Sequence, residues 1–314
     1  MRVERRRFLR AAAAGAAGLS LSPWAAAGVF SRSAPPLPVT RLSDNLVTIS
    51  GAGGNVVALS GPEGLLLVDC GAAEHSSQLQ ATLATLAGGG RVQTVFNTHW
   101  HVDHTGANEL LRRAGANIIA HESTRLWMGS EIREQWQNRI YKPRPREAWP
   151  TQTFYYKSCK LSFAGESIEY GYLPQAHTDG DIYVYFRGQN VLVAGGVLSV
   201  GRYPVLDYCT GGWIVGMVKA TEQLLALVDD HTRIIPGTGP VQTRADLQAE
   251  HDMLSTVHTA LWKMMRESLS ANDMIAARPT AQFDAKWGHP ELFISNAYEG
   301  MYGHIAEYLG KGVV

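Results

Sequence analysis

A short apolar segment of the chain leads directly into a cluster of metal-binding side chains. Residues 92–97 have the composition of a buried strand, and His99, His101, Asp103 and His104 follow at once. His99 and His101 are two residues apart on an extended segment, so their side chains project to the same side and can bind one ion. Asp103 and His104 fall where the chain turns into a helix and point into neighbouring space. The fold must therefore place ligands for two adjacent ions at the end of a strand.

The ligand types indicate a transition metal. Imidazole nitrogens together with a carboxylate suit zinc, and also iron, cobalt or nickel, better than calcium or magnesium. Single histidines often lie at surfaces or caps, but four potential ligands this close together after an apolar strand favour a metal site. A third histidine is available at His177, between two expected strands. Three neutral histidines leave one tetrahedral position open for water.

Strand and helix patterns alternate along the chain and predict two packed sheets flanked by helices, an α+β fold. Glycine-bearing turns separate short apolar segments in the first half, and a similar order recurs in the second half. The expected strands are 46–50, 55–60, 64–69, 92–97, 161–163, 167–172, 182–187, 190–194 and 232–235. The expected helices are 76–86, 105–114 (capped by Thr105) and 213–227.

Two regions differ from the rest of the chain in composition and in the spacing of their apolar residues. Residues 125–156 are rich in Trp, Tyr, Arg and Pro without a clear period, which predicts a long loop that either serves the function or packs over the sheet edge. From Thr243 onward, apolar residues recur at helical spacing, and two more helices are expected, the last beginning at Pro290. The apolar face of the long helix comprises Leu247, Leu254, Val257, Leu261, Met264 and Leu269.

Residues 1–27 are typical of an export signal. The basic start Arg5-Arg6-Arg7-Phe8-Leu9 leads into an alanine-rich apolar run that ends at Ala25-Ala26-Ala27. The Arg-Arg-x-Phe-Leu pattern resembles a twin-arginine signal, and an ordinary secretory signal is the alternative. The apolar run is short for a transmembrane anchor. We therefore expect a mature protein that is soluble, not membrane-bound, and periplasmic or secreted.

Charge and cysteine content exclude two classes of site. Beyond residue 27 the chain has 23 basic and 27 acidic side chains, a net charge of −4, so no nucleic-acid partner is expected. Cys70, Cys159 and Cys209 allow at most one disulfide within the chain. None of them stands in a Cys-x-x-Cys pair, so a cysteine-based metal site is not expected.

Four segments together resemble the metallo-β-lactamase superfamily of hydrolases. The segment 98–104 (Thr-His-Trp-His-Val-Asp-His) is specific for that family, and the others match by order and spacing. These are 65–71 (Leu-Leu-Leu-Val-Asp-Cys-Gly), 176–181 (Ala-His-Thr-Asp-Gly-Asp) and 234–237 (Ile-Ile-Pro-Gly).

The resemblance implies an αββα sandwich over residues 41–245. We expect a signal peptide at 1–27, a linker at 28–40 and a C-terminal helical extension at 246–314. The resemblance also implies that His99, His101 and His177 bind a first zinc ion, and that Asp103 and His104 belong to a second site.

Two positions depart from the binuclear pattern of that family. A bridging Asp and a His normally stand where this chain has Gly196 and Thr238. Glycine offers no ligand and a hydroxyl is a poor one, so we expect one zinc ion and a doubtful second site. The carboxylates that could substitute are Asp179, Asp181 and Asp207, although loop capping explains each of them as well.

The resulting hypothesis is a mononuclear zinc hydrolase in which metal-bound hydroxide attacks an acyl substrate: a lactone, thioester, cyclic amide or β-lactam. Asp103 would orient the water or accept its proton, and His104 would transfer protons. The alternative is a degenerate scaffold that binds a ligand or partner without turnover, because two ligand positions are lost together.

Two other chemistries are disfavoured by the same positions. Iron-dependent persulfide oxidation needs the carboxylate that Gly196 lacks, and phosphodiester hydrolysis commonly uses two metals. Specificity is expected to lie in residues 125–156 and in the C-terminal helices. There, Trp287, Tyr298 and Tyr302 are expected to serve packing more than a pocket. The remaining histidines are expected to be surface or core residues.

Overall fold

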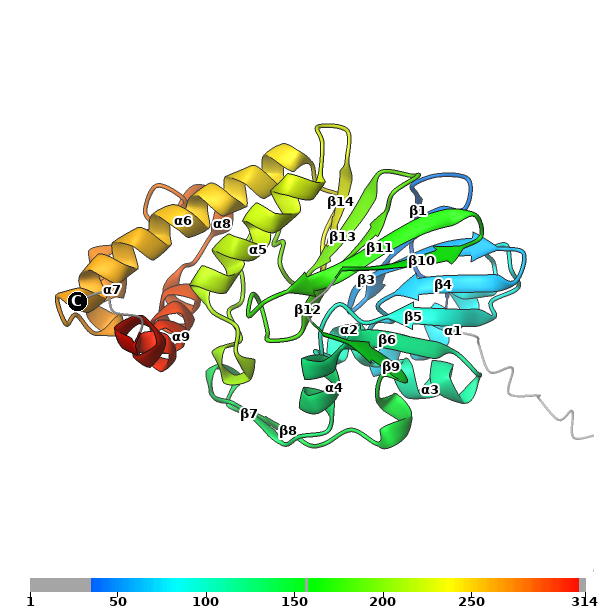
Figure 1. Ribbon diagram of the computed structural model, residues 1–314, viewed down its shortest axis with the longest axis horizontal. Coiled ribbons are helices and arrows are strands. Elements are labelled where there is room, and N and C mark those ends of the chain that lie inside the picture. Colours follow the sequence, from blue (N-terminus) through cyan, green and yellow to red (C-terminus); the bar gives the residue numbers. More distant parts are fainter. Residues whose placement is uncertain (1–34, 156–157, 311–314) are drawn as a thin grey trace, which may run out of the picture. The chain divides into compact units, whose positions relative to one another are not determined.

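Two β-sheets pack against each other at the centre of the fold (Figure 1). The computed structural model describes residues 35–155 and 158–310, so the predicted export signal at 1–27 lies outside the described residues. The larger sheet has the order β1-β2-β3-β4-β5-β6-β9, antiparallel from β1 to β4 and parallel from β4 to β9. Its strands are β1 (Val39–Arg41), β2 (Leu46–Ala52), β3 (Gly54–Gly61), β4 (Gly64–Val68), β5 (Val92–Phe96), β6 (Asn117–His121) and β9 (Gln152–Phe154).

The smaller sheet has the order β10-β11-β12-β13-β14, with only the last pair parallel among its described strands. Its strands are β10 (Cys159–Phe163), β11 (Glu166–Leu173), β12 (Asp181–Phe186), β13 (Val191–Gly195) and β14 (Arg233–Pro236). Every strand expected from the sequence is present, shifted by at most two residues at either end.

Apolar residues on both faces of the central strands explain the layered arrangement. In β4, Leu66 and Val68 face the other sheet, whereas Leu65 and Leu67 face the helices outside. Successive side chains of a strand point to opposite faces, so a continuous apolar run can bury both. Separate cores lie between the sheets and on each outer face. The predicted αββα sandwich is confirmed.

Helices cover the two outer faces and extend the smaller-sheet side (Figure 1). The core outside the larger sheet includes side chains of α1 and α3, and the core outside the smaller sheet includes those of α5, α6 and α9. The helices are α1 (Ser76–Leu83), α2 (Val102–Thr105), α3 (Asn108–Arg113), α4 (Glu122–Met128), α5 (Ile214–Leu227), α6 (Arg244–Arg266), α7 (Ala271–Ala277), α8 (Asp284–Trp287) and α9 (Glu291–Gly310).

Three helix predictions need correction. Thr105 does not cap a helix, because it closes α2 and its hydroxyl donates to the carbonyls of Trp100 and His101. A second short helix, α3, follows instead. Leu269 lies beyond the end of α6, although it still packs on the same core. Three helices rather than two follow α6 in the described residues, because residues 284–287 form the short α8.

The beginning of α6 agrees with its prediction. The hydroxyl of Thr243 accepts a hydrogen bond from the backbone N–H of Asp246, and the carboxylate of Asp246 accepts one from the backbone N–H of Thr243. The predicted boundary between residues 245 and 246 therefore falls in the first turn of this helix. Similarly, β1 begins at Val39, inside the segment predicted as a linker. The domain limits themselves stay a prediction.

Residues 125–156 are not a structureless loop. They include the end of α4, a hairpin of β7 (Ile132–Glu134) and β8 (Arg139–Tyr141), and the edge strand β9, which pairs with β6. The alternative of packing at the sheet edge is therefore confirmed for β9. The prediction of a plain loop failed because three-residue strands are too short to show a period.

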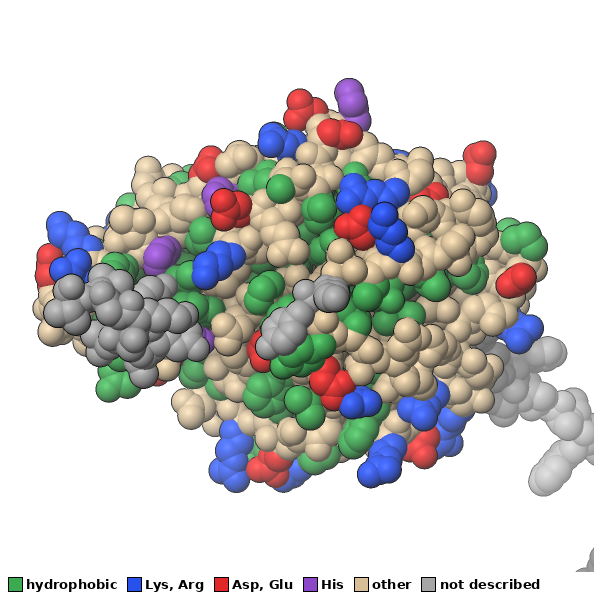
Figure 2. Space-filling view, viewed as in Figure 1, with side chains coloured by type: hydrophobic (Ala, Val, Ile, Leu, Met, Phe, Trp, Pro, Cys, Tyr) green, Lys and Arg blue, Asp and Glu red, His purple; other side chains and the backbone are tan. Residues whose placement is uncertain are grey.

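Figure 2 shows basic and acidic side chains mixed over the face in view, without a gathering of one sign. Among the described residues, no helix is long and apolar enough to cross a membrane. Cys70, Cys159 and Cys209 are not joined in disulfides.

Candidate metal centre

The loops that follow the strands of both sheets meet at one cavity of ≈ 600 Å³. His99 to His104 follow β5, His177 lies between β11 and β12, Gly196 follows β13, and Thr238 follows β14. All of these positions line the cavity or belong to a segment that does. The structure thus brings together residues from across the chain, as the sequence predicted.

His99, His101 and His177 form a compact group. Each offers a nitrogen, and the three nitrogens lie within 4.8 Å of one another. The other nitrogen of each ring has its own partner: His99 Nδ1 contacts the Thr98 hydroxyl at 2.9 Å, His101 Nε2 contacts Asp207 at 3.0 Å, and His177 Nδ1 contacts the Val205 carbonyl at 2.7 Å. Such outer partners fix the orientation of metal-binding histidines.

Those partners also fix where the ring protons are. A carbonyl or carboxylate oxygen can only accept, so His177 Nδ1 and His101 Nε2 must both carry hydrogen. The nitrogens that remain, His177 Nε2 and His101 Nδ1, face each other at 3.0 Å. Two bare acceptors at that distance repel, so either a proton or a metal cation must lie between them.

Burial keeps this group in the form that binds metals. His99 is 1% exposed, and desolvation followed by the neighbouring histidines lowers its pKa well below the ordinary value. Desolvation, followed by the proximity of His101, likewise lowers the pKa of His177. Three neutral imidazoles with converging lone pairs fit a zinc-type ion. The residues present therefore fit the metal that the sequence predicts.

The second group of ligands is incomplete. His104 Nε2 lies 3.7 Å from a carboxylate oxygen of Asp103, and its Nδ1 lies 2.7 Å from Asp69. Although burial alone would lower the pKa of His104, the charge of Asp69 and its hydrogen bond raise it. The raised pKa favours the protonated form of His104, and a protonated imidazole has no lone pair for a metal. The pKa of Asp103 is lowered, because the neighbouring histidines outweigh its burial.

At both Gly196 and Thr238, another side chain of the protein lies where a second-site ligand would have to stand. A Cβ atom on Gly196 would lie 2.2 Å from the ring of His177, so a side chain there would displace a ligand of the first site. The hydroxyl of Thr238 accepts a hydrogen bond of 3.0 Å from Arg202. A guanidinium group therefore lies beside the position where the family pattern predicts a histidine.

None of the three proposed substitute carboxylates completes the second group. Asp179 accepts from Tyr172 and Ser123, and Asp181 accepts from the backbone and hydroxyl of Thr178, so both shape the loop. Asp207 supports His101 from outside the cavity. The plainer interpretation of Asp179 and Asp181 is therefore correct.

Sequence reasoning missed several residues around the site. Asp69 accepts from Thr98 and contacts His104, which gives the strand ending at residue 68 a direct role. Trp136 and Tyr141 from the β7–β8 hairpin line the cavity. Trp287, which was expected to serve packing, also lines the cavity. Among the described residues, His75, His121, His231, His251, His258, His289 and His304 belong to no group of three ligands.

Known proteins share this fold. The family model of the metallo-beta-lactamase superfamily matches residues 50–271, more than half of the chain. The chain belongs to that superfamily, whose members are mostly metal-dependent hydrolases. No curated protein matches it in sequence.

Solved structures resemble the chain at low identity. A metallo-beta-lactamase from Pontibacter korlensis is 19% identical (TM-score 0.55), with 70% of this chain and 99% of that chain covered. The DIM-1 metallo-beta-lactamase is also 19% identical (TM-score 0.55; 71% and 98% covered). A double mutant of the sec-alkyl sulfatase PisA1 is 14% identical with a TM-score of 0.66. That match covers 87% of this chain and half of the other. At such identities the likeness concerns the fold alone.

Proposed function

We propose that the protein is a hydrolase with a single zinc ion at His99, His101 and His177. The observation that carries this proposal is the convergence of three histidine nitrogens within 4.8 Å of one another, with those of His101 and His177 at 3.0 Å. The metal makes such an arrangement favourable. Bound by three neutral histidines, zinc lowers the pKa of a water molecule toward neutrality and supplies a nucleophile for hydrolysis.

Asp103 and His104 supply the proton chemistry. The side chain of Asp103 is 47% exposed in the cavity and ionised, so it can orient a water molecule and accept its proton. His104 is held by Asp69 and has a raised pKa, so it can donate a proton to a leaving group. Losing the second metal leaves both residues available for these roles.

The cavity supports a small acyl substrate. Aromatic residues Trp136, Tyr141 and Trp287 form its apolar wall, and Arg202 is the only Arg or Lys among the described lining residues. A guanidinium group pairs well with a carboxylate. We therefore propose lactones, thioesters, cyclic amides or β-lactams that carry a carboxylate, hydrolysed in the periplasm or outside the cell.

The test compares turnover of such a panel by wild type, His99→Ala and Asp103→Asn, with metal content measured for each. We expect His99→Ala to lose one equivalent of zinc and its activity. Asp103→Asn should retain the zinc and lose on the order of 10²–10⁴-fold in kcat, the usual contribution of a general base. Equal turnover by wild type and His99→Ala would contradict the proposal.

The filled positions at Gly196 and Thr238 favour a second candidate, a scaffold that binds a ligand without turnover. In that case wild type would hold zinc and bind panel compounds without hydrolysing any of them. Isothermal titration beside the turnover assay separates the two functions.

A further inference from the structure

A second cluster of ligand-type side chains lies outside the cavity. Glu134 ends β7, and Asp207 and Cys209 belong to the turn around the short 3-10 helix η4 (Tyr208–Thr210). One oxygen or sulfur atom of each lies within 4.8 Å of the others, the same limit that His99, His101 and His177 meet. These three residues, which we call the outer cluster, are absent from the cavity lining.

Glu134 is the unusual member of the outer cluster. The residue is 1% exposed, and its carboxylate lies beside Asp207, the Trp136 indole and Cys209. None of these neighbours makes a hydrogen bond of good geometry to either carboxylate oxygen. A buried polar group without a partner costs about 1–3 kcal/mol, and a charged one costs more. A side chain of this kind, placed beside another buried carboxylate and a thiol, indicates a group that the protein atoms do not supply.

Two explanations compete for this arrangement. A proton shared between Glu134 and Asp207 would remove the charge repulsion, with the Trp136 indole and the Cys209 thiol as neighbouring donors. In that arrangement both oxygens of Glu134 and the indole nitrogen of Trp136 still lack a hydrogen bond of good geometry. A divalent cation would engage both carboxylates and the thiolate together. Zinc accepts both carboxylate oxygen and thiolate sulfur as ligands, and a water molecule can complete its four-coordination.

We propose that Glu134, Asp207 and Cys209 bind a second, structural divalent cation of the zinc type. Asp207 already accepts from His101 and Thr210, and a carboxylate offers about four lone-pair positions, so it can serve both sites. The sequence did not suggest this site, because Glu134 stands 73 and 75 residues before the other two ligands and none of them belongs to a Cys-x-x-Cys pair.

The outer cluster lies where a bound cation would connect two segments that shape the cavity. It joins the β7–β8 hairpin, which supplies Trp136 and Tyr141 to the cavity wall, to the turn that holds His101 through Asp207. Next to the outer cluster, the hydroxyl of Tyr208 in this turn donates to the side-chain oxygen of Gln135, which follows β7, at 3.4 Å. A cation there would hold the hairpin in place and fix Asp207 behind His101.

Cobalt substitution tests the proposal on the full-length protein. The protein is stripped of metal and titrated with Co²⁺ while the near-ultraviolet absorption is recorded. Thiolate bound to Co²⁺ gives a charge-transfer band, whereas the three-histidine site contains no sulfur. We expect two equivalents of Co²⁺ to bind and the band to appear. Cys209→Ser should lose the band and one equivalent, and the matched control Cys159→Ser should lose neither.

Other variants separate this site from the proposed active site. His99→Ala should lose one equivalent of Co²⁺ and keep the charge-transfer band. Glu134→Gln should weaken or abolish the band and keep the metal ion bound by the three histidines. A titration that ends at one equivalent with no thiolate band in wild type would overturn the proposal and assign Glu134 a shared proton. That result would leave the three-histidine hydrolase unaffected.

Discussion

The hydroxyl of Thr98 decides which nitrogen of His99 can bind a metal. It donates to Asp69 at 2.8 Å, so its lone pairs accept from His99 Nδ1 and leave Nε2 as the ligand. The same logic holds for His101 with Asp207 and for His177 with the Val205 carbonyl. At the residue scale, a neighbouring group therefore determines which ring nitrogen of each of the three histidines faces the metal.

Thr98→Val should weaken metal binding at the histidines on the order of 10–100-fold, because it removes the partner of His99 at nearly constant volume. Competition with a fluorescent zinc chelator measures the change. Thr48→Val is the matched control, since the buried Thr48 hydroxyl has no partner. Unchanged affinity in Thr98→Val would show that its hydroxyl does not orient His99.

The charge of Arg202 is expected to oppose a second metal in the cavity. Thr238→His restores a third ligand beside Asp103 and His104, but Arg202 lies next to that position. In a Cys209→Ser background, Thr238→His with Arg202→Ala should therefore bind one more equivalent of zinc than Thr238→His alone. Elemental analysis measures the difference, and equal content in both would remove Arg202 from this explanation.

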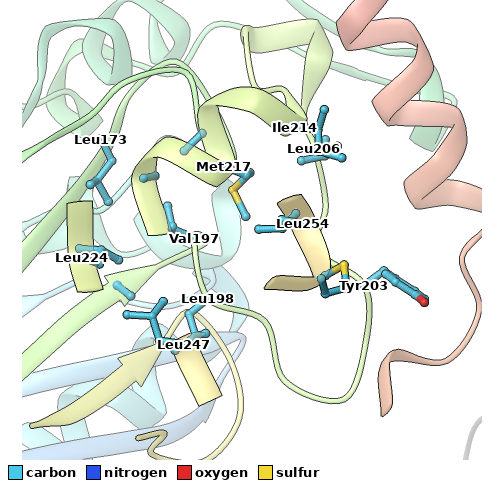
Figure 3. Close-up of a cluster of buried hydrophobic side chains, with 14 of the residues drawn as sticks. Leu173, Val197, Leu198, Tyr203, Leu206, Ile214, Met217, Leu224, Leu247 and Leu254 are labelled. Carbon is cyan, nitrogen blue, oxygen red and sulfur yellow. The ribbon is translucent and has the colours of Figure 1, made fainter. Parts of the chain in front are cut away.

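At the element scale, α6 anchors the loop that follows β13. Glu250 is buried on α6 and its carboxylate accepts from the backbone of Ser199, a cavity-lining residue. Val197 and Leu198 of the same loop belong to the core that contains side chains of α5 and α6 (Figure 3), and Tyr203 stacks on Phe293 of α9. Arg202 is thus presented by a loop whose neighbouring residues are buried.

Glu250 should make stability depend on pH. Burial raises its pKa from the ordinary 4.5 to about 8, despite the hydrogen bonds from Ser199. Below 4.5 both folded and unfolded forms hold the proton. Between 4.5 and about 8 only the folded form holds it, so this group's contribution to stability falls as the pH rises and then levels off.

Glu250→Gln removes this titration. The melting temperature of wild type relative to Glu250→Gln should therefore fall steadily from pH 5 to pH 8 in thermal unfolding experiments. Subtracting the variant cancels the other titrating groups. Parallel curves across that range would show that Glu250 titrates normally in the folded protein.

At the scale of the whole molecule, the core outside the smaller sheet joins the C-terminal helices to the rest of the fold. Leu254 on α6 is fully buried beside Met217 of α5 (Figure 3). Leu254→Ala should lower the free energy of unfolding by about 2–5 kcal/mol, because it leaves a cavity. Urea denaturation measures this loss.

Leu126→Ala is the control for that loss, since Leu126 is 59% exposed. Its effect should stay within about 0.5 kcal/mol, as for most surface substitutions. If both variants lost the same stability, the C-terminal helices would not share the core as described.

The sequence by itself determined the fold class, the strand that carries His99 and His101, and the three-histidine group. Those features are local: apolar runs set the strands, and spacing sets which side chains share a side. His177 also followed, because the family pattern fixes its place between two strands. The loss of the second site at Gly196 and Thr238 is expected for the same reason and stays a prediction.

Only the tertiary structure decided what surrounds those ligands. Asp69, Asp207 and Arg202 act through contacts with residues 29 to 106 positions away, and no local pattern records such contacts. The outer cluster likewise exists only because the hairpin folds against the turn at Asp207. Short sequence motifs specify which residues can bind the metal. The residues that hydrogen-bond to those ligands depend on which distant segments the packed sheets bring together.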